Sequence, residues 1–254
     1  MGDILTVRML GRFSIELHEK SIDDSSNRMK KVWLLLAYLI YARNQRVTQE
    51  GLQALLNGNN SSDALDANGR LKAMLYRARA LLNQMDESCG HDLIIRKNGT
   101  YAWNTEVPIR LDVDVFESLC KEAAKAEDKE ICLQIYLEAI DLYKGDFLAK
   151  LSTESWVIPI SVYYHEMYLR VVGETLLLLE EAGRWNDGIE ICEKALKIEP
   201  YSEELYQHLM RCRISAGDRA GAQMAYEEMS EILFSNFGVM PSEESRQLYR
   251  TAAR

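Results

Sequence analysis

The sequence predicts a mostly α-helical protein with a small β part, divided into two domains. Hydrophobic residues recur at helical spacing over most of the chain, and short alternating stretches are confined to its first part. Net charge also differs between the parts: residues 1–110 carry 15 Lys and Arg against 12 Asp and Glu, and residues 111–254 carry 15 against 27. Since 254 residues suffice for two modest domains, we expect domains at 1–110 and 111–254.

Composition indicates a protein of the cytoplasm. No apolar run approaches the ~20 residues of a transmembrane helix, and Met1 to Thr6 lacks the basic start and hydrophobic core of a signal peptide. The five cysteines are odd in number and widely spaced, which favours free thiols in a reducing compartment over disulfides or zinc. We therefore expect no membrane partner, no metal and no cofactor.

The first domain begins with two predicted strands, Ile4–Leu10 and Phe13–Leu17, around a Gly11-Arg12 turn. Residues 30–42 are too long an apolar run for an ordinary strand and predict a largely buried helix. Thr48 is a typical N-cap for the next helix, which a polar loop at 57–63 follows.

Residues 68–85 predict one amphipathic helix. Leu71, Leu75, Ala78 and Leu82 form its apolar stripe, and basic residues line both flanks of a small-residue ridge on the opposite side. No acidic residue occurs between Arg70 and Gln84. Such a face fits the DNA major groove; the alternative is a solvated basic face without a partner.

A hairpin is predicted after this helix, over Asp92–Trp103, because Asn98-Gly99 is a strong turn signal between two apolar stretches. Short strands, three helices and a hairpin are the order of a winged helix-turn-helix, and the N-terminal sheet marks the response-regulator variant. Base-edge contacts would specify sequence and phosphate contacts would position the domain. We expect Asn68 and Arg70 to read bases. The other candidate contacts with double-stranded DNA are Lys72, Tyr76, Arg77 and Arg79 on the helix and Arg96 and Lys97 on the wing.

The second domain contains a repeat of 34 residues. Ala182-Gly183 and Ala216-Gly217 have this spacing, as do Gly188 and Ala222. Pro200, Tyr206 and Leu209 also fit the tetratricopeptide pattern. Stacked helix pairs form a curved surface that usually binds a protein or peptide. The alternative is that the array packs only on the first domain.

Taken together, these features resemble the Streptomyces antibiotic regulatory protein family and its bacterial transcriptional activator domain. The resemblance covers nearly the whole chain. Its residues are Val7, Met9-Leu10-Gly11, Phe13-Ser14-Ile15, Lys31 to Leu39, Val47-Thr48, Glu50, Leu52, Asp112-Val113-Asp114, Phe116-Glu117, Tyr143, Gly145-Asp146-Phe147-Leu148, Trp156, Leu209-Met210, Gly217, Tyr226, Phe237-Gly238-Val239 and Pro241-Ser242.

The resemblance implies a bacterial, sequence-specific transcription regulator, usually an activator, that binds repeated promoter half-sites and contacts RNA polymerase or another protein through the helical domain. A homodimer on DNA would match repeated half-sites. Three positions depart from the family pattern: Asn57 replaces tryptophan, Thr100 replaces the second glycine of the wing, and Ala78 replaces leucine. These departures leave the operator sequence open.

Two other classes of function compete with a transcription regulator. An enzyme is disfavoured, because the four histidines lie far apart and no phosphate-binding or nucleophile motif occurs. A tetratricopeptide-like interaction scaffold, whose degenerate winged helix no longer binds DNA, is favoured by the net charge of -9. The basic third helix argues against the scaffold.

Overall fold

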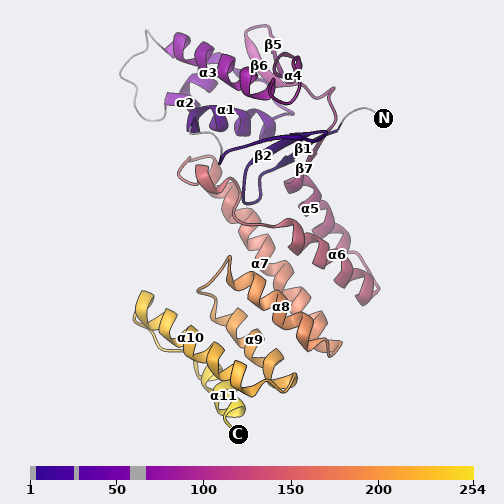
Figure 1. Ribbon diagram of the computed structural model, residues 1–254, viewed down its shortest axis with the longest axis vertical. Coiled ribbons are helices and arrows are strands. Elements are labelled where there is room, and N and C mark those ends of the chain that lie inside the picture. The colour runs from indigo at the N-terminus through magenta and orange to yellow at the C-terminus, as the bar shows by residue number, and fades with distance from the viewer. Residues whose placement is uncertain (1–3, 26–28, 58–66) are drawn as a thin grey trace. The chain divides into compact units, whose positions relative to one another are not determined.

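A computed structural model describes residues 4–25, 29–57 and 67–254, which are mostly helical with all strands before residue 112 (Figure 1). This confirms the predicted fold class. The chain forms two compact units. Unit 1 comprises Met1–Ser118 and Leu142–Tyr164, and unit 2 comprises Leu119–Asp141 and His165–Arg254. The units therefore interleave in sequence, whereas the segments 1–110 and 111–254 are contiguous, and that predicted domain boundary stays a prediction.

Unit 1 begins with a four-stranded sheet of order β3-β2-β1-β7. The strands are β1 (Leu5–Arg8), β2 (Ser14–Leu17), β3 (Lys20–Asp23) and β7 (Ile109–Leu111). Leu5, Val7 and Ile15 alternate with more exposed residues and are fully buried. The two predicted strands are confirmed at slightly shorter bounds. β3 was missed because only Ile22 in it is buried, and β7 because it pairs in parallel with a strand that lies far away in sequence.

Three helices build the core of unit 1: α1 (Lys30–Tyr41), α2 (Gln49–Asn57) and α3 (Ala67–Leu82). α1 packs against α2 and α3, and its residues 32–37 are all buried, as expected for a central helix. Thr48 caps α2 as predicted, since its Oγ1 accepts a hydrogen bond from the Gly51 N–H at 3.0 Å. Of the loop predicted at 57–63, residues 58–63 lie outside the described residues.

A second sheet, of order β4-β6-β5, carries the predicted hairpin. Its strands are β4 (Val47–Thr48), β5 (Ile94–Lys97) and β6 (Thr100–Trp103), and the short helix α4 (Cys89–Leu93) precedes β5. Lys97 pairs with Thr100, which leaves a two-residue loop. Asn98 and Gly99 in that loop have φ of 54° and 78°, so the predicted Asn-Gly turn is confirmed.

One buried carboxylate joins the ends of two neighbouring strands of unit 1's first sheet, β1 and β7. Asp112 is the first residue of α5 (Asp112–Ala123), and its side chain accepts hydrogen bonds from the backbone N–H groups of Met9, Leu10 and Val113 at 2.7–2.9 Å. These bonds connect the end of β1 to the residue after β7. Burial raises the pKa of Asp112 to about 6, although the three N–H groups act in the opposite direction.

The segment 142–164 also packs within unit 1, and it includes the 3-10 helix Ala149–Leu151. The Leu148 N–H donates to Met9 O at 2.8 Å, and the Gly11 N–H donates to Asp146 O at 3.0 Å. Gly11 has φ of 96°, and an added Cβ would lie 3.0 Å from the Lys144 carbonyl carbon. This position therefore requires glycine for both conformation and space.

Unit 2 is helical throughout its described residues. The helices that contribute to it, besides the end of α5, are α6 (Lys129–Leu142), α7 (Val157–Glu181), α8 (Trp185–Leu196), α9 (Glu203–Ser215), α10 (Arg219–Phe237) and α11 (Glu243–Ala252). Successive helices α8, α9 and α10 pack against each other in chain order, and α11 packs on α9 and α10. This nearest-neighbour packing is typical of stacked helical repeats.

The 34-residue repeat recurs in the backbone hydrogen bonds. After α7, the Gly183 N–H donates to Glu180 O and the Arg184 N–H to Leu179 O; after α9, the equivalent donors at 217 and 218 bond to residues 214 and 213. Gly183 and Gly217 have φ of 67° and 86°. Both helices therefore end in the same left-handed glycine cap.

Replacing Gly188 tests how tightly the repeats pack. A Cβ at Gly188 of α8 would lie 2.7 Å from Cys212 Sγ of α9, whereas one at Gly173 of α7 would meet nothing within 4 Å. We expect Gly188→Val to lower the free energy of unfolding by about 1–3 kcal/mol through overpacking. The matched Gly173→Ala change should raise it by about 0.5–1 kcal/mol through helix propensity. Urea unfolding measures both, and a neutral Gly188→Val would contradict the close crossing.

Replacing Asp112 tests the buried carboxylate. Asp112→Asn places an N–H donor against backbone N–H groups, so we expect the free energy of unfolding to fall by about 1–3 kcal/mol at neutral pH. Because the folded pKa is raised, the folded chain binds the proton more tightly than the unfolded chain. This group's contribution is full below about pH 4 and is lost as the pH rises through about 6.

Urea unfolding of both proteins at about pH 5 and pH 7.5 provides the measurement. The stability difference between wild type and Asp112→Asn should shrink by about 1 kcal/mol as the pH rises. An unchanged difference would show that the pKa of Asp112 is not raised.

Candidate nucleic-acid interface

The exposed face of α3 is basic, small and free of carboxylates. Leu71, Leu75, Ala78, Leu81 and Leu82 are buried, as the apolar stripe predicted. The rest of the helix presents Asn68, Gly69, Arg70, Lys72, Ala73, Tyr76, Arg77 and Ala80 to solvent. Small residues between cations allow a helix to come close to a phosphate backbone while its long side chains reach past the ridge.

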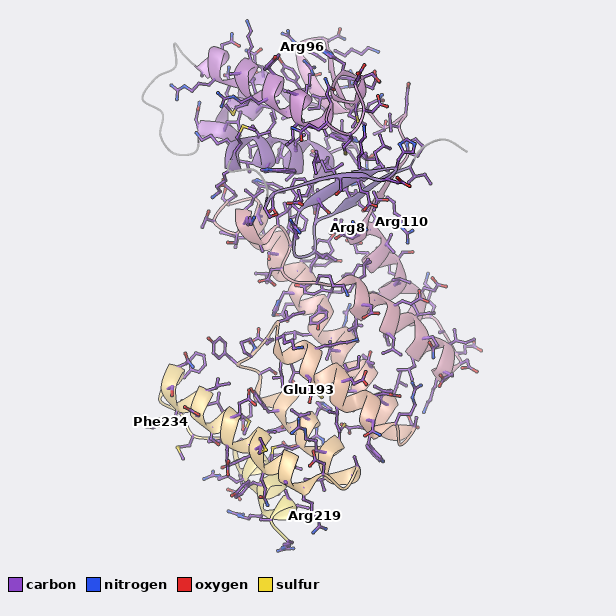
Figure 2. All side chains as sticks on the ribbon, in the orientation of Figure 1. Arg8, Arg96, Arg110, Glu193, Arg219 and Phe234 are labelled. Carbon is purple, nitrogen blue, oxygen red and sulfur yellow. The ribbon has the colours of Figure 1, made fainter. Side chains whose placement is uncertain are left out.

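The wing adds two further cations. Arg96 and Lys97 are both exposed at the end of β5, beside the Asn98-Gly99 turn (Figure 2 labels Arg96). The Arg96 guanidinium lies 5.5 Å from the centre of the Tyr101 ring, a cation–π contact that limits the directions in which the arginine points. The Thr100 hydroxyl donates to Lys97 O at 2.7 Å and tightens the turn.

A cavity of about 370 Å³ lies between α3 and the wing. It brings together four of the predicted residues, Lys72, Tyr76, Arg79 and Arg96, from two elements. Asn68, Arg70, Arg77 and Lys97 do not line it. Arg70 and Arg77 lie on the other flank of α3, as the 3.6-residue period requires. The predicted residues therefore form two groups: four around the cavity and four outside it.

Five further residues line the cavity and were not among the predicted DNA contacts: Leu75, Ala80, Asn83, His91 and Tyr101. Asn83 follows Arg79 by four residues, so helical spacing could have indicated it. His91 and Tyr101 reach the cavity only because α4 and β6 pack beside α3, which no local pattern reveals. The Gly90 N–H donates to Asn83 Oδ1 at 2.7 Å and holds α4 there.

Arg79 has a structural contact that the sequence did not indicate. Its side chain is half-buried, and Nη2 donates to Ile94 O at 2.9 Å. Its Nε is buried and has no hydrogen-bond partner. Arg79 therefore fastens α3 to the first strand of the wing, which makes it a positioning residue as well as part of the cavity wall.

Ion pairs compensate part of the positive charge elsewhere in unit 1. Five basic side chains elsewhere in the unit form ion pairs: Arg8 with Glu16, Arg12 with Asp23, Lys30 with Glu154, Arg43 with Asp114, and Lys150 with Asp24. Among the described residues, Lys72, Arg77, Arg96 and Lys97 have no such partner. We call these four residues the cationic face. Their charges are uncompensated and available to a polyanion.

The chemistry of an enzyme or metal site is not evident in the described part of the chain. No three His, Cys, Asp or Glu side chains there are grouped to hold a metal ion. Burial raises the pKa of the Cys89 and Cys212 thiols to about 11, so neither is an activated nucleophile. No helix within the described ranges is long and apolar enough to cross a membrane.

Comparison with solved structures shows which known fold this chain resembles. The chain is similar to Mycobacterium tuberculosis EmbR, solved in complex with a low-affinity phosphopeptide, with a TM-score of 0.66 and 19% identity over 99% of this chain and 65% of that chain. It thus spans just under two thirds of that EmbR chain, and the likeness at this identity is one of fold. The TPR2AB domain of yeast Sti1, solved with pHSP90, matches with 14% identity over 89% of this chain and 98% of that chain. Its TM-score of 0.32 is too low to indicate a shared fold.

The family comparison covers the C-terminal part. A search of the curated proteins gives no match. The bacterial transcriptional activator domain matches residues 111–252, which is more than half of the chain. The resemblance to the Streptomyces antibiotic regulatory proteins, with a winged helix and a tetratricopeptide-like domain, is confirmed at the level of family and fold. The chain belongs to the bacterial transcriptional activator domain family, a family of transcription regulators.

Proposed function

We propose that the chain is a sequence-specific, DNA-binding transcription activator. α3 enters the major groove of double-stranded DNA, and the wing contacts the phosphate backbone. The observation that carries the proposal is the cationic face: four cations on two adjacent elements, with no ion-pair partner among the described residues, while five cations elsewhere in unit 1 are paired. Such a protein works in the bacterial cytoplasm, where the genomic DNA lies.

The residues have separate roles in this proposal. Asn68 and Arg70, at the N-terminal end of α3, contact base edges, because that end of a recognition helix is the part that usually reaches bases. Lys72, Arg77, Arg96 and Lys97 neutralise phosphates, and Tyr76, which is 76% exposed, packs on the backbone or a base edge. Arg79 holds the wing against α3 through its bond to Ile94 O.

The protein acts as two copies on repeated half-sites, and its helical unit contacts RNA polymerase or another protein. A single reading helix covers few base pairs, so two copies are needed to exceed non-specific affinity.

Selection from fragmented genomic DNA would supply the operator, and titration of that fragment would give the affinity and the stoichiometry. Absence of an enriched sequence, with no binding at low salt, would favour the protein-interaction scaffold instead. A one-to-one complex on the operator would contradict the two-copy arrangement alone.

A Lys72→Ala variant tests phosphate contact. We expect it to weaken binding to operator and random DNA by a similar factor and to reduce the slope of log affinity against log salt by about 0.9, since one phosphate contact fewer releases fewer counterions. Fluorescence anisotropy at several salt concentrations measures both. Lys20→Ala is the matched control, because Lys20 is exposed in the same unit but lies on β3. Equal losses in the two variants would indicate only a general charge effect.

An Arg70→Ala variant tests base reading. We expect it to weaken operator binding by about 1–3 kcal/mol, or roughly tenfold to a hundredfold, while random DNA loses far less. Competition of operator against random duplex in the same titration reports the specificity ratio directly. If both duplexes lose affinity equally, Arg70 contacts a phosphate and the base reader lies elsewhere on α3.

A further inference from the structure

Large apolar side chains are exposed together at the C-terminal end of α10 and just beyond it. Phe234 and Phe237 are 63% and 57% exposed, and Met240 is 69% exposed. The Tyr201 ring meets the Phe237 ring edge-on, with centres 5.3 Å apart, although both side chains remain about half exposed. Single exposed apolar residues are ordinary, but a contiguous group of this kind marks an interaction surface.

Exposed carboxylates lie on α10 next to this apolar group. Met224, Glu227, Glu231 and Phe234 are all exposed and follow each other at spacings of three and four residues, which places them on one side of the helix. Between Arg219 and Arg246 the sequence contains no Lys or Arg. Figure 2 shows Phe234 and Arg219 towards opposite ends of α10, so the helix's one arginine lies far from the apolar end.

The carboxylates of this stripe are uncompensated. Within the described part of the chain, neither Glu227 nor Glu231 has an ion-pair partner. Glu243 on the neighbouring helix α11, by contrast, pairs with Arg246 at 3.2 Å and with Arg250 at 3.0 Å. The negative potential beside the exposed phenylalanines is therefore not cancelled by the protein itself.

We propose that this surface docks a basic amphipathic helix of a protein partner. We define the α10 face as Tyr201, Met224, Glu227, Glu231, Phe234 and Phe237. The apolar anchors of the partner helix, at spacings of three and four residues, would cover the aromatic side chains of Phe234 and Phe237. Its Lys and Arg side chains would meet Glu227 and Glu231. In such recognition of an amphipathic helix, apolar contact supplies affinity and charge supplies selectivity.

Charge argues against the other occupants. A second copy joined through the same face would bring Glu227 and Glu231 of both copies into one interface, because a twofold interface uses the same patch on each copy. DNA and the anionic surface of a membrane would be repelled by the same carboxylates. A cationic protein segment is the occupant whose chemistry complements both the apolar and the acidic parts.

The inference deepens the proposed function, since it assigns a chemical class to the protein partner contacted through unit 2. It rests on the proposed function only for the role of that partner in transcription. The α10 face lies in unit 2, whereas the cationic face lies in unit 1. Variants in one therefore report separately from variants in the other. DNA titrations with α10-face variants distinguish failure of this inference from failure of DNA binding.

The test uses the full chain and a labelled synthetic helix of leucine and lysine, about 18 residues or five turns long. A second peptide carries neutral glutamine in place of every lysine, so that it is not attracted to the cationic face. We expect the lysine peptide to bind and the glutamine peptide to bind far more weakly. Phe234→Ala with Phe237→Ala should weaken binding about tenfold or more, as for buried aromatic anchors. Glu227→Gln with Glu231→Gln should weaken it severalfold and reduce its dependence on salt.

Matched controls separate the α10 face from the general acidity of unit 2. Glu138→Gln with Glu190→Gln removes the same charge from exposed positions on α6 and α8, and Leu177→Ala removes an exposed apolar side chain from α7. These variants should bind the lysine peptide as wild type does. All substituted side chains are exposed, and thermal melts verify that each variant stays folded.

Several results would overturn the inference. They are equal binding of the two peptides, equal loss in α10-face and control variants, or no binding of the lysine peptide at all. Sedimentation showing self-association that Phe234→Ala abolishes, without peptide binding, would assign the face to a second copy instead. Unchanged DNA affinity in the α10-face variants is expected in every case.

Discussion

The buried carboxylate of Asp112 is the interaction on which the arrangement of unit 1 depends. It accepts hydrogen bonds from backbone N–H groups at the end of β1 and at the start of α5, two segments about a hundred residues apart. Without it, each buried N–H would cost about 1–3 kcal/mol. The parallel pairing of β1 with β7 ends at Leu111, directly before Asp112. Beyond it, Met9 O and the Gly11 N–H form hydrogen bonds with the 142–164 segment. One side chain thus organises a sheet, a helix start and a docking segment.

The distribution of uncompensated charge differs between the two units. Lys72, Arg77, Arg96 and Lys97 are unpaired within the described residues, on the helix and hairpin that a winged helix-turn-helix uses to meet DNA. On α10 it is the carboxylates Glu227 and Glu231 that lack ion-pair partners there. A net charge of -9 therefore conceals a cationic face and an acidic one. Both proposals rest on these uncompensated charges, because a charge that is already paired within the fold attracts a partner less strongly.

Local patterns predicted the elements with strong local signals. The stripe Leu71, Leu75 and Ala78 indicated which side of α3 is buried, and Asn98-Gly99 indicated the wing turn with its left-handed φ angles. The spacing between Gly183 and Gly217 indicated a repeat whose two caps share their hydrogen bonds. β3, β4 and β7 were not predicted, since each is short and is stabilised by a partner strand rather than by its own alternation.

The sequence by itself determined the helical periodicity, the turn residues, the charge asymmetry and the resemblance that the family comparison confirmed. These properties depend on residues a few positions apart, or on residue order alone. The tertiary structure decided which cations remain unpaired, that Arg79 bonds to Ile94 O, and that His91 and Tyr101 join Lys72 at one cavity. It also decided that the segment 142–164 belongs to unit 1. Such contacts join residues from separate elements, and no local pattern encodes which elements will pack together.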